Sequence, residues 1–349
     1  MKDILDKRWR PPRASNQTNK SIFKEFTVMK KAISLILVMI LALSLFAGCG
    51  GAADDGITKI AIVQQLDHSS LDEIRVAIEA ELKAIATEKG LEIQIESYNG
   101  QNDASVLNQI GTEVVSEGFD CIIPIATTAA QCMVTAAEGN IPVIYAAISD
   151  PEGAGLTGME KVTGVSDALN TPYILDMMLA ANPDIQTVGL LYSNSEPNSI
   201  KPIADAKAYL DSKGIAYLEK TGTTSGEIIE AASALVGRVD AVFTPTDNAV
   251  MAAESAVAEI LNEAKIPHYA GADSFVLSGA FATCGVNYTD LGTYAAQMAM
   301  DVLAGGQIPE YHVMDGGFIT VNTDTAAMLG LDYSVFAADG AQIIEVNNG

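Results

Sequence analysis

Residues 59–98 read KIAIVQQLDHSSLDEIRVAIEAELKAIATEKGLEIQIESY, and this stretch decides the fold class. It begins with a short run rich in β-branched residues, Lys59–Val63, which is typical of a strand. Leu71–Lys89 then places apolar residues at helical spacing, and Gly90 ends that helix. Leu91–Tyr98 alternates as a strand does. A strand, a helix and a second strand in this order predict a parallel βαβ unit.

The same alternation continues along the chain. It predicts helices over Ala104–Glu117 and Ala129–Glu138, and strands over Cys121–Ile125 and Val143–Ala147. Such an order requires a parallel sheet with helices on both faces. The pattern then starts again, with predicted elements over Tyr173–Ala180, Thr187–Tyr192, Ile200–Lys213, Ile215–Lys220, Ile228–Leu235, Ala241–Thr244, Ala249–Ala264, Ile266–Ala270, Ala280–Cys284, Tyr294–Leu303 and Gly317–Val321.

Two consecutive series of similar size predict an α/β protein with two Rossmann-like parallel-sheet lobes joined by a hinge, and a seam near residues 165–172. We expect the N-terminal lobe to comprise residues 57–165 plus about 286–316. The C-terminal lobe is expected to comprise residues 166–285 plus about 317–349. Ligands of open parallel sheets bind beyond the carboxyl ends of the strands, so a cleft between strand-end loops is predicted.

The segment before the first strand has the build of a secretory signal. Met29–Cys49 contains two lysines, an apolar run over Ala32–Ala47 and small residues before the cysteine. That run is short for a membrane span, which needs about 20 apolar residues. Phe46–Cys49 resembles the lipobox of bacterial lipoproteins, in which the cysteine is lipidated and becomes the mature N-terminus.

We therefore predict a lipoprotein signal peptide over residues 29–48, a lipid on Cys49 and a tether over residues 49–56. An uncleaved anchor helix is the alternative, and either one holds the following domain at a membrane surface, on its extracytoplasmic face. Residues 1–28 are polar and basic, and we interpret them as a non-native upstream extension or as an extended n-region.

The charge of the remaining chain excludes some partners. The whole chain has 20 Lys and Arg and 44 Asp and Glu, of which nine and three lie in residues 1–48. The remainder carries 11 basic and 41 acidic groups, a net charge near −30. Such a surface repels nucleic acid and anionic lipid, so the only expected membrane contact is the N-terminal lipid.

The cysteines and histidines give no sign of a metal site. Beyond Cys49 the chain has Cys121, Cys132 and Cys284, an odd number that cannot form a complete disulfide framework. Cys121 in its apolar run is interpreted as a buried free thiol, although a Cys121–Cys132 pair stays possible if the two Cα atoms approach within about 7 Å. The three histidines lie far apart and have no metal-ligand spacing.

Polar side chains follow the predicted strands and form the candidate ligand site. Thr127 and Thr128 stand where a strand gives way to a helix, and a helix N-terminus with hydroxyl groups can hold a carboxylate. Ordinary helix capping by threonine is the alternative. The other candidates in strand-end loops are Gln65, Ser149, Asp150, Ser195, Asn198, Asp247, Asn248 and Asp273.

A charge argument assigns part of this site to an ammonium group. Asp247, Asn248 and Asp273 lie in loops of the second lobe and supply negative charge there. A zwitterion would then meet an anion seat in one lobe and carboxylates in the other. Capping of a helix by Asp247 is the alternative. A loop after a strand carries few core contacts, so we expect replacement of Asp247 to change folding stability little.

No enzyme motif is present. The chain has no GxSxG, no HExxH and no phosphate-binding loop, and pairs of carboxylates are common simply because the chain is acidic. We therefore expect neither catalysis nor a cofactor.

A series of motifs in one order resembles a known family. The motifs are Gln101–Asp103, Ile125–Gln131, Ile148–Leu156, Val162–Asp167, Leu191–Ser199, Val239–Ala241, Pro245–Asn248 and Gly285–Tyr288. Together they are similar to the ABC-transporter substrate-binding lipoproteins of the tryptophan and tyrosine type, over essentially all of residues 57–335. The resemblance implies a type I periplasmic-binding-protein fold, and it adds Gln131 to the ligand-binding candidates.

The resemblance also implies what the protein does. It implies capture of a small solute, often tyrosine, phenylalanine or tryptophan, by a monomer that closes about its hinge and delivers the solute to an ABC permease. A surface sensor that presents a sugar, nucleoside or amino acid to a membrane receptor is the alternative. Both alternatives place the protein on the extracytoplasmic face of the cell membrane.

Overall fold

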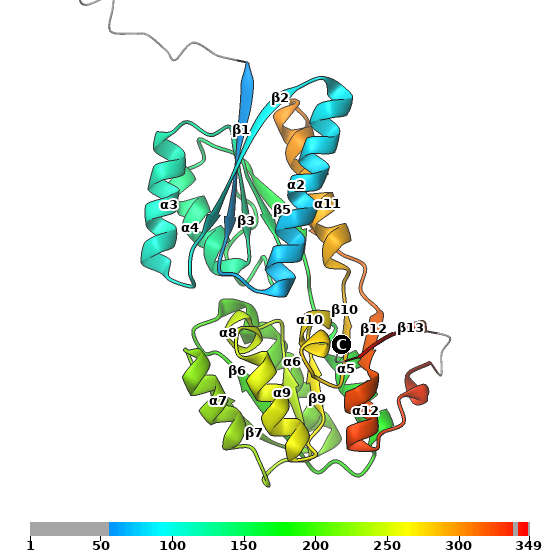
Figure 1. Cartoon of the computed structure of the whole chain (residues 1–349). Coiled ribbons are helices and arrows are strands. Elements are labelled where there is room, and N and C mark those ends of the chain that lie inside the picture. Colours follow the sequence, from blue (N-terminus) through cyan, green and yellow to red (C-terminus); the bar gives the residue numbers. More distant parts are fainter. Residues whose placement is uncertain (1–55, 338–340, 348–349) are drawn as a thin grey trace, which may run out of the picture. The chain divides into compact units, whose positions relative to one another are not determined.

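The computed structural model describes residues 56–337 and 341–347, which contain two sheets with helices around each (Figure 1). The sheet of the N-terminal lobe has the order β11-β5-β4-β3-β1-β2, and its paired strands are all parallel. These strands are β1 (Ile57–Gln64), β2 (Glu92–Asn99), β3 (Cys121–Ile125), β4 (Val143–Ala146), β5 (Val162–Ser166) and β11 (His312–Val313). The lobe's helices are α2 (Ser69–Lys89), α3 (Ala104–Ser116), α4 (Thr127–Ala137) and α11 (Tyr288–Leu303).

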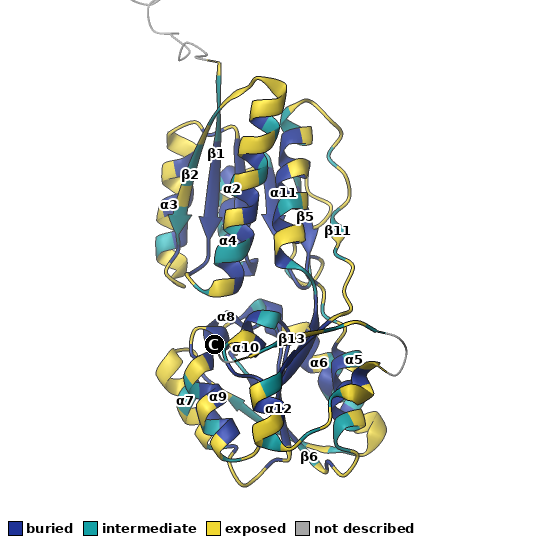
Figure 2. Cartoon of the chain, turned by 45° about the vertical axis from the view of Figure 1, so that its right-hand side comes forward, coloured by how far each residue is buried: buried dark blue, intermediate teal, exposed yellow. Residues whose placement is uncertain are grey.

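Alternate residues of β1 build the cores on the two faces of this sheet. Ile60 and Ile62 are fully buried and belong to the core that α2 and α11 cover. Ala61 and Val63 are equally buried and belong to the core beneath α3 and α4. Successive side chains of a strand point to opposite faces, so a continuous apolar run fits a strand that is covered on both sides. Figure 2 shows the buried strands between helices whose outer faces are exposed.

The C-terminal lobe has a seven-stranded sheet in the order β13-β12-β10-β9-β8-β6-β7. Its strands are β6 (Thr187–Tyr192), β7 (Ala216–Thr221), β8 (Ala241–Thr244), β9 (His268–Ala270), β10 (Ala282–Gly285), β12 (Phe318–Asn322) and β13 (Ile343–Val346). Its helices are α5 (Thr171–Ala181), α6 (Pro197–Lys213), α7 (Ser225–Ser233), α8 (Asn248–Met251), α9 (Glu254–Glu263), α10 (Asp273–Leu277), α12 (Thr323–Leu329) and the 3₁₀ turn η1 (Ser334–Ala337). β10 and β12 pair antiparallel, whereas the other strand pairs are parallel.

Within residues 56–337, the chain passes between the two lobes three times. The crossover segments are residues 167–170, after β5, residues 286–287, before α11, and residues 314–317, after β11. The second and third crossovers bring α11 and β11 to the N-terminal lobe, where α11 packs beside α2. The prediction of an α/β protein with two parallel-sheet lobes is thereby confirmed.

Several elements differ from the sequence prediction. The helix predicted over Ala249–Ala264 is interrupted and forms α8 and α9. The interruption places Glu254 in the first turn of α9, where its buried carboxyl lies 3.0 Å from Nδ1 of His268. α11 begins at Tyr288, earlier than the predicted Tyr294, because Asn287 caps the helix by accepting a hydrogen bond from the Asp290 amide. The strands β5, β11 and β13 and the helices α10 and α12 were not predicted.

Other structural expectations concern cysteines, metals and membrane spans. Cys121, Cys132 and Cys284 are free thiols, and Cys121 is buried as predicted. Within the described ranges, no helix combines the length and the apolar character that a bilayer crossing demands. No cluster of three or more metal-ligating side chains occurs in the same ranges. The predicted signal peptide, Cys49 and residues 1–28 lie outside the described residues.

Candidate ligand-binding site

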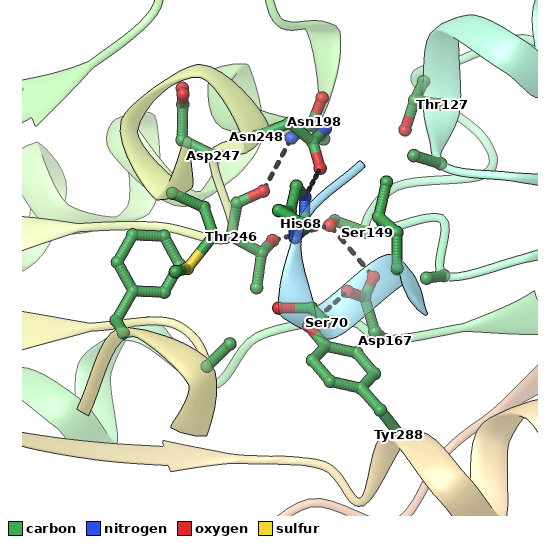
Figure 3. A pocket seen from close by; sticks show the side chains of 16 residues that line it. His68, Ser70, Thr127, Ser149, Asp167, Asn198, Thr246, Asp247, Asn248 and Tyr288 are labelled. Carbon is green, nitrogen blue, oxygen red and sulfur yellow. Dashed lines mark hydrogen bonds between the residues drawn. The ribbon is translucent and has the colours of Figure 1, made fainter. Parts of the chain in front are cut away.

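A cavity of about 20 Å³ lies between the two lobes (Figure 3). This volume is enough for roughly one water molecule. Its walls come from the residues that follow β1, β3, β4, β5, β6, β8, β9 and β10. The carboxyl ends of the strands of both sheets therefore face the same small space, where ligands of open parallel sheets are expected.

Direct hydrogen bonds between side chains join the lobes around this cavity. They connect His68 to Asn248 at 3.0 Å, Ser70 to Ser274 at 2.5 Å, Ser149 to Thr246 at 3.0 Å and Gln65 to Glu196 at 3.0 Å. In each pair the first residue belongs to the N-terminal lobe and the second to the C-terminal lobe. The described arrangement of the lobes is thus a closed one.

Asp167 is a buried carboxylate in the cavity wall. It lies at the start of the first crossover, and Ser149 Oγ donates to its Oδ1 at 3.0 Å. Tyr288 donates its hydroxyl proton to Oδ2 at 3.3 Å. Burial raises the pKa of Asp167, against the effect of these two hydrogen bonds. None of the ion pairs found in the described part of the chain includes Asp167. The cavity therefore offers a carboxylate with neutral partners only.

The hydrogen bonds of Asn248 define the state of His68. The Asn248 amide group donates to Glu196 Oε2 at 2.8 Å, so its Oδ1 must accept from Nε2 of His68. Burial lowers the pKa of His68, which favours the neutral ring. Its other ring nitrogen, Nδ1, is buried, has no hydrogen-bond partner and is then an acceptor in the cavity wall.

The start of α4 provides a different polar group. Thr127 lies in the first turn of this helix, and its buried hydroxyl has no partner. Ala126, just before it, has φ 76° and ψ 161°, a conformation found almost only in glycine. Ala147, after β4, also has a positive φ of 58°. Both alanines line the cavity, so strained backbone gathers where two strands end at this site.

The carboxylate of Asp247 accepts its hydrogen bonds from donors of its own lobe. Its Oδ2 accepts from the Ser193 amide at 2.7 Å and from Ser199 Oγ at 2.6 Å, and its Oδ1 accepts from the Val250 amide at 3.0 Å. It is fully buried and caps α8. Burial raises the pKa of Asp247. Its alternative role as a helix cap is therefore present in the structure, and the expectation that its loop carries few core contacts is wrong.

Glu196 forms a buried contact between the lobes. The residue is 3% exposed, and its carboxyl accepts from Gln65 Nε2 of the other lobe and from Asn248 Nδ2 of its own lobe. Burial raises the pKa of Glu196 to about 8, and the nearby Asp247 carboxylate adds to the rise. The carboxyl of Glu196 is thus largely neutral at pH 7 in the closed arrangement.

Apolar side chains complete the walls. They are Leu71, Met251, Ala272, Phe275 and the ring of Tyr288. A second cavity of about 400 Å³ lies at the crossovers and shares Asp167 and Tyr288 with the first. Its other walls include Leu169, Tyr173 and Val286. The space next to Asp167 therefore has polar and apolar walls, and its aromatic side chains include Tyr173 and Tyr288.

The structure brings five of the predicted site residues to the cavity wall. These are Thr127, Ser149, Asn198, Asp247 and Asn248. Asn198 donates through Nδ2 to the Thr246 carbonyl at 2.7 Å, while its Oδ1 is buried and has no partner. The two lobes are both represented in this set, as the sequence predicted for a cleft between them.

The other predicted site residues lie behind or beside the wall. Gln65 accepts from the Thr128 amide at 3.1 Å and so supports α4 from behind. The remaining four predicted residues lie outside the wall. Gln131 donates to the Ala154 carbonyl, and Asp150 accepts from the Gly153 amide. Ser195 forms a hydrogen bond with Ser193, and Asp273 begins α10 between the wall residues Ala272 and Phe275.

Five polar residues of the wall are not among the predicted site residues: His68, Ser70, Asp167, Thr246 and Tyr288. Each of them lies in a strand-end loop or in one of the motifs that carry the family resemblance. His68 and Thr246 lie in strand-end loops that were identified, so their position was the available signal. Asp167 follows β5, a strand that the sequence pattern does not predict, so no strand-end loop is expected there.

Comparison with known proteins gives the family context. A family model for ABC transporter substrate binding proteins matches residues 59–335. A tyrosine-binding protein from Clostridioides difficile (strain R20291) is 33% identical over 335 residues, which cover 90% of this chain and 96% of that protein.

Two solved structures share the fold at similar sequence identity. One is a domain from Streptococcus pneumonia in complex with L-Trp, with a TM-score of 0.77, 30% identity, and coverage of 83% of this chain and 99% of that one. The other is the ligand-free, open structure of a substrate-binding protein with adhesive properties from Clostridium difficile. It has a TM-score of 0.64 and 32% identity, and the match covers 84% of this chain and 100% of that one.

Proposed function

Because the chain belongs to the ABC transporter substrate-binding protein family, whose members bind solutes and are not enzymes, we propose that its solute is an aromatic amino acid. Tyrosine, phenylalanine and tryptophan are the candidates. The relatives described above support this choice, since one is a tyrosine-binding protein and another was solved with L-Trp.

The observation that carries the proposal is the buried carboxylate of Asp167 next to aromatic walls. A buried charge is costly unless a charged or hydrogen-bonding partner compensates it, and an ammonium group is such a partner. His68 Nδ1 adds a second acceptor, whereas the Thr127 hydroxyl and the start of α4 suit a carboxylate. Phe275 and Tyr288 offer rings for contact with an aromatic side chain.

Binding is achieved by hinge closure. The cavity of about 20 Å³ is far too small for an amino acid, so the lobes have to separate before the solute enters and have to close around it less tightly than they do here. Contacts of the solute with both lobes then favour the closed state. The higher TM-score against the L-Trp complex than against the ligand-free open structure, at nearly equal identity, supports a closed arrangement here.

The protein acts at the membrane surface. Lipid on Cys49 anchors it on the extracytoplasmic face, where it passes the solute to an ABC permease. Cys49→Ala should release the protein into the soluble fraction or leave the signal segment uncleaved. A mature N-terminus at another residue, without an acyl group, would contradict the anchor and leave the ligand proposal intact.

Titration calorimetry tests the ligand class. Tyrosine, phenylalanine or tryptophan should bind with a Kd on the order of 1 μM or tighter, which corresponds to about −8 kcal/mol. A sugar and a nucleoside serve as matched controls and should give no heat of binding. Binding of either control, with no heat from the three amino acids, would disprove the ligand assignment.

A further inference from the structure

We infer that Glu196 is a positioning residue that couples closure of the two lobes to uptake of a proton. This coupling belongs to the closed state itself and does not depend on which solute is bound. Glu196 and Gln65 join the lobes through a hydrogen bond of 3.0 Å.

The surroundings of Glu196 disfavour a negative charge in the closed state. The residue is almost inaccessible, and the hydrogen-bond donors around its carboxyl, Gln65, Asn248 and Asn198, are neutral amides. The charged group that faces it is Asp247, another acid, which raises the cost of ionisation further. The amide donors favour the charged carboxylate, but burial and the Asp247 carboxylate outweigh them.

Separation of the lobes removes one side of this enclosure. Gln65 belongs to the N-terminal lobe, together with Asn102 and Thr128, the other two partners of its amide. When these residues move away as one body, the Oε1 side of Glu196 faces solvent. Ionisation then costs much less, so the open state releases the proton.

The direction of the pH dependence follows from the pKa of Glu196, which is about 8 when the lobes are closed and lower when the Oε1 side of the carboxyl faces solvent. Between these two pKa values closure requires proton uptake, so the ratio of closed to open protein falls by up to about ten-fold for each pH unit. The proton-linked advantage of the closed state is complete below the open-state pKa and is lost as pH rises through about 8.

His68 acts in the opposite direction. It contacts Asn248 across the seam, and burial lowers its pKa from 6.5, so closure releases a proton from it at acid pH. Asp67 and Asp72 act on the pKa of His68 from its own lobe. This release opposes the uptake by Glu196 below about pH 6.5, so His68 does not interfere between pH 6.5 and 8.5. Burial in the cavity wall also raises the pKa of Asp167, and a variant of Glu196 is needed to separate the two carboxyl groups.

Distances between spin labels on the two lobes test the inference in the full chain without added solute. The labels are attached to the substitutions Ser116→Cys in α3 and Ser212→Cys in α6, both at exposed positions, and the distance between them increases when the lobes open. Cys132→Ser removes the partly buried thiol that would otherwise be labelled too. The closed fraction should be high at pH 6.5. By pH 8.5 the ratio of closed to open protein should have fallen at least ten-fold. Glu196→Gln should remove most of this dependence.

Two variants separate the role of Glu196 from general effects. Glu230→Gln removes an exposed carboxylate of the same lobe and should keep the pH profile of the wild-type protein. Gln65→Ala removes the contact across the seam and should flatten the profile, even if replacement of Glu196 disturbs local folding. A closed fraction that is equal at both pH values, or that falls as steeply in Glu196→Gln as in wild type, would overturn the inference.

Discussion

The hydroxyl of Ser149 lies 3.0 Å from Oδ1 of Asp167, and both residues are buried where the N-terminal lobe meets the cavity. The Ser149 hydroxyl has one proton, which it donates in its hydrogen bond to the Asp167 carboxylate. In the hydrogen bond across the seam, Thr246 of the other lobe must therefore be the donor and Ser149 the acceptor. A single chain of hydrogen bonds therefore links the first crossover, the cavity and the opposite lobe. Closure of the lobes therefore adds a donor to the hydroxyl group that holds Asp167.

Replacement of Asp167 by asparagine should weaken binding of an aromatic amino acid by about 10- to 150-fold. A hydrogen bond to a charged group contributes roughly 1.5–3 kcal/mol, and the ammonium would lose it. Calorimetry should show a smaller loss for the deaminated analogue, which has no ammonium. Asp150→Asn, beside the wall, is the matched control and should bind like wild type. Equal weakening of both ligands would refute the ammonium site.

Asp247→Ala should lower the free energy of unfolding by on the order of 3 kcal/mol. The change leaves the Ser193 amide, Ser199 hydroxyl and Val250 amide without their acceptor, and each buried unsatisfied group costs about 1–3 kcal/mol. Urea denaturation measures the loss. Asp103→Ala, at the exposed cap of α3, should cost clearly less. Comparable losses in the two variants would mean that Asp247 is no more than an ordinary cap.

Glu254→Gln should make folding stability less dependent on pH. Burial raises the pKa of Glu254, so its protonated form is favoured in the folded state. The stability from this group is complete below about pH 4.5 and is lost as pH rises through the raised pKa. Urea midpoints at pH 5 and pH 8 should therefore differ more in wild type than in the variant. Glu259→Gln, on the exposed face of α9, should keep the wild-type difference.

Thiol reagents should distinguish Cys132 from the two buried cysteines. In the folded protein Cys132 is only partly buried and should react first, whereas Cys121 and Cys284 should react only after unfolding. Burial raises the pKa of Cys121 to about 12, which removes the reactive thiolate at neutral pH. Mass spectrometry after alkylation reads the sites directly. A Cys121–Cys132 disulfide in the purified protein would contradict both the structure and this order of reaction.

The prediction of the fold from the sequence succeeded where apolar runs were long and clearly bounded. β1, α2 and β2 were placed within two residues because their periodicities differ and Gly90 separates them. β5 was missed because Val162–Ser166 is short, contains a glycine, and becomes a strand through its pairing with β4 on one side and β11 on the other. Pairing with distant segments leaves no pattern of apolar residues in the strand's own sequence from which the strand could be predicted.

The sequence by itself determined the two-lobed α/β fold and the strand-end loops that hold the site, because periodicity and glycine punctuation are local properties. Only the tertiary structure decided which side chains face the cavity. Asp247 was a reasonable choice for the ammonium, but its oxygens accept hydrogen bonds from Ser193, Ser199 and Val250. Asp167 instead faces the cavity with neutral partners. Whether a carboxylate is used by the fold or left for a solute depends on donors far away in the chain, which approach only when the lobes are folded and closed.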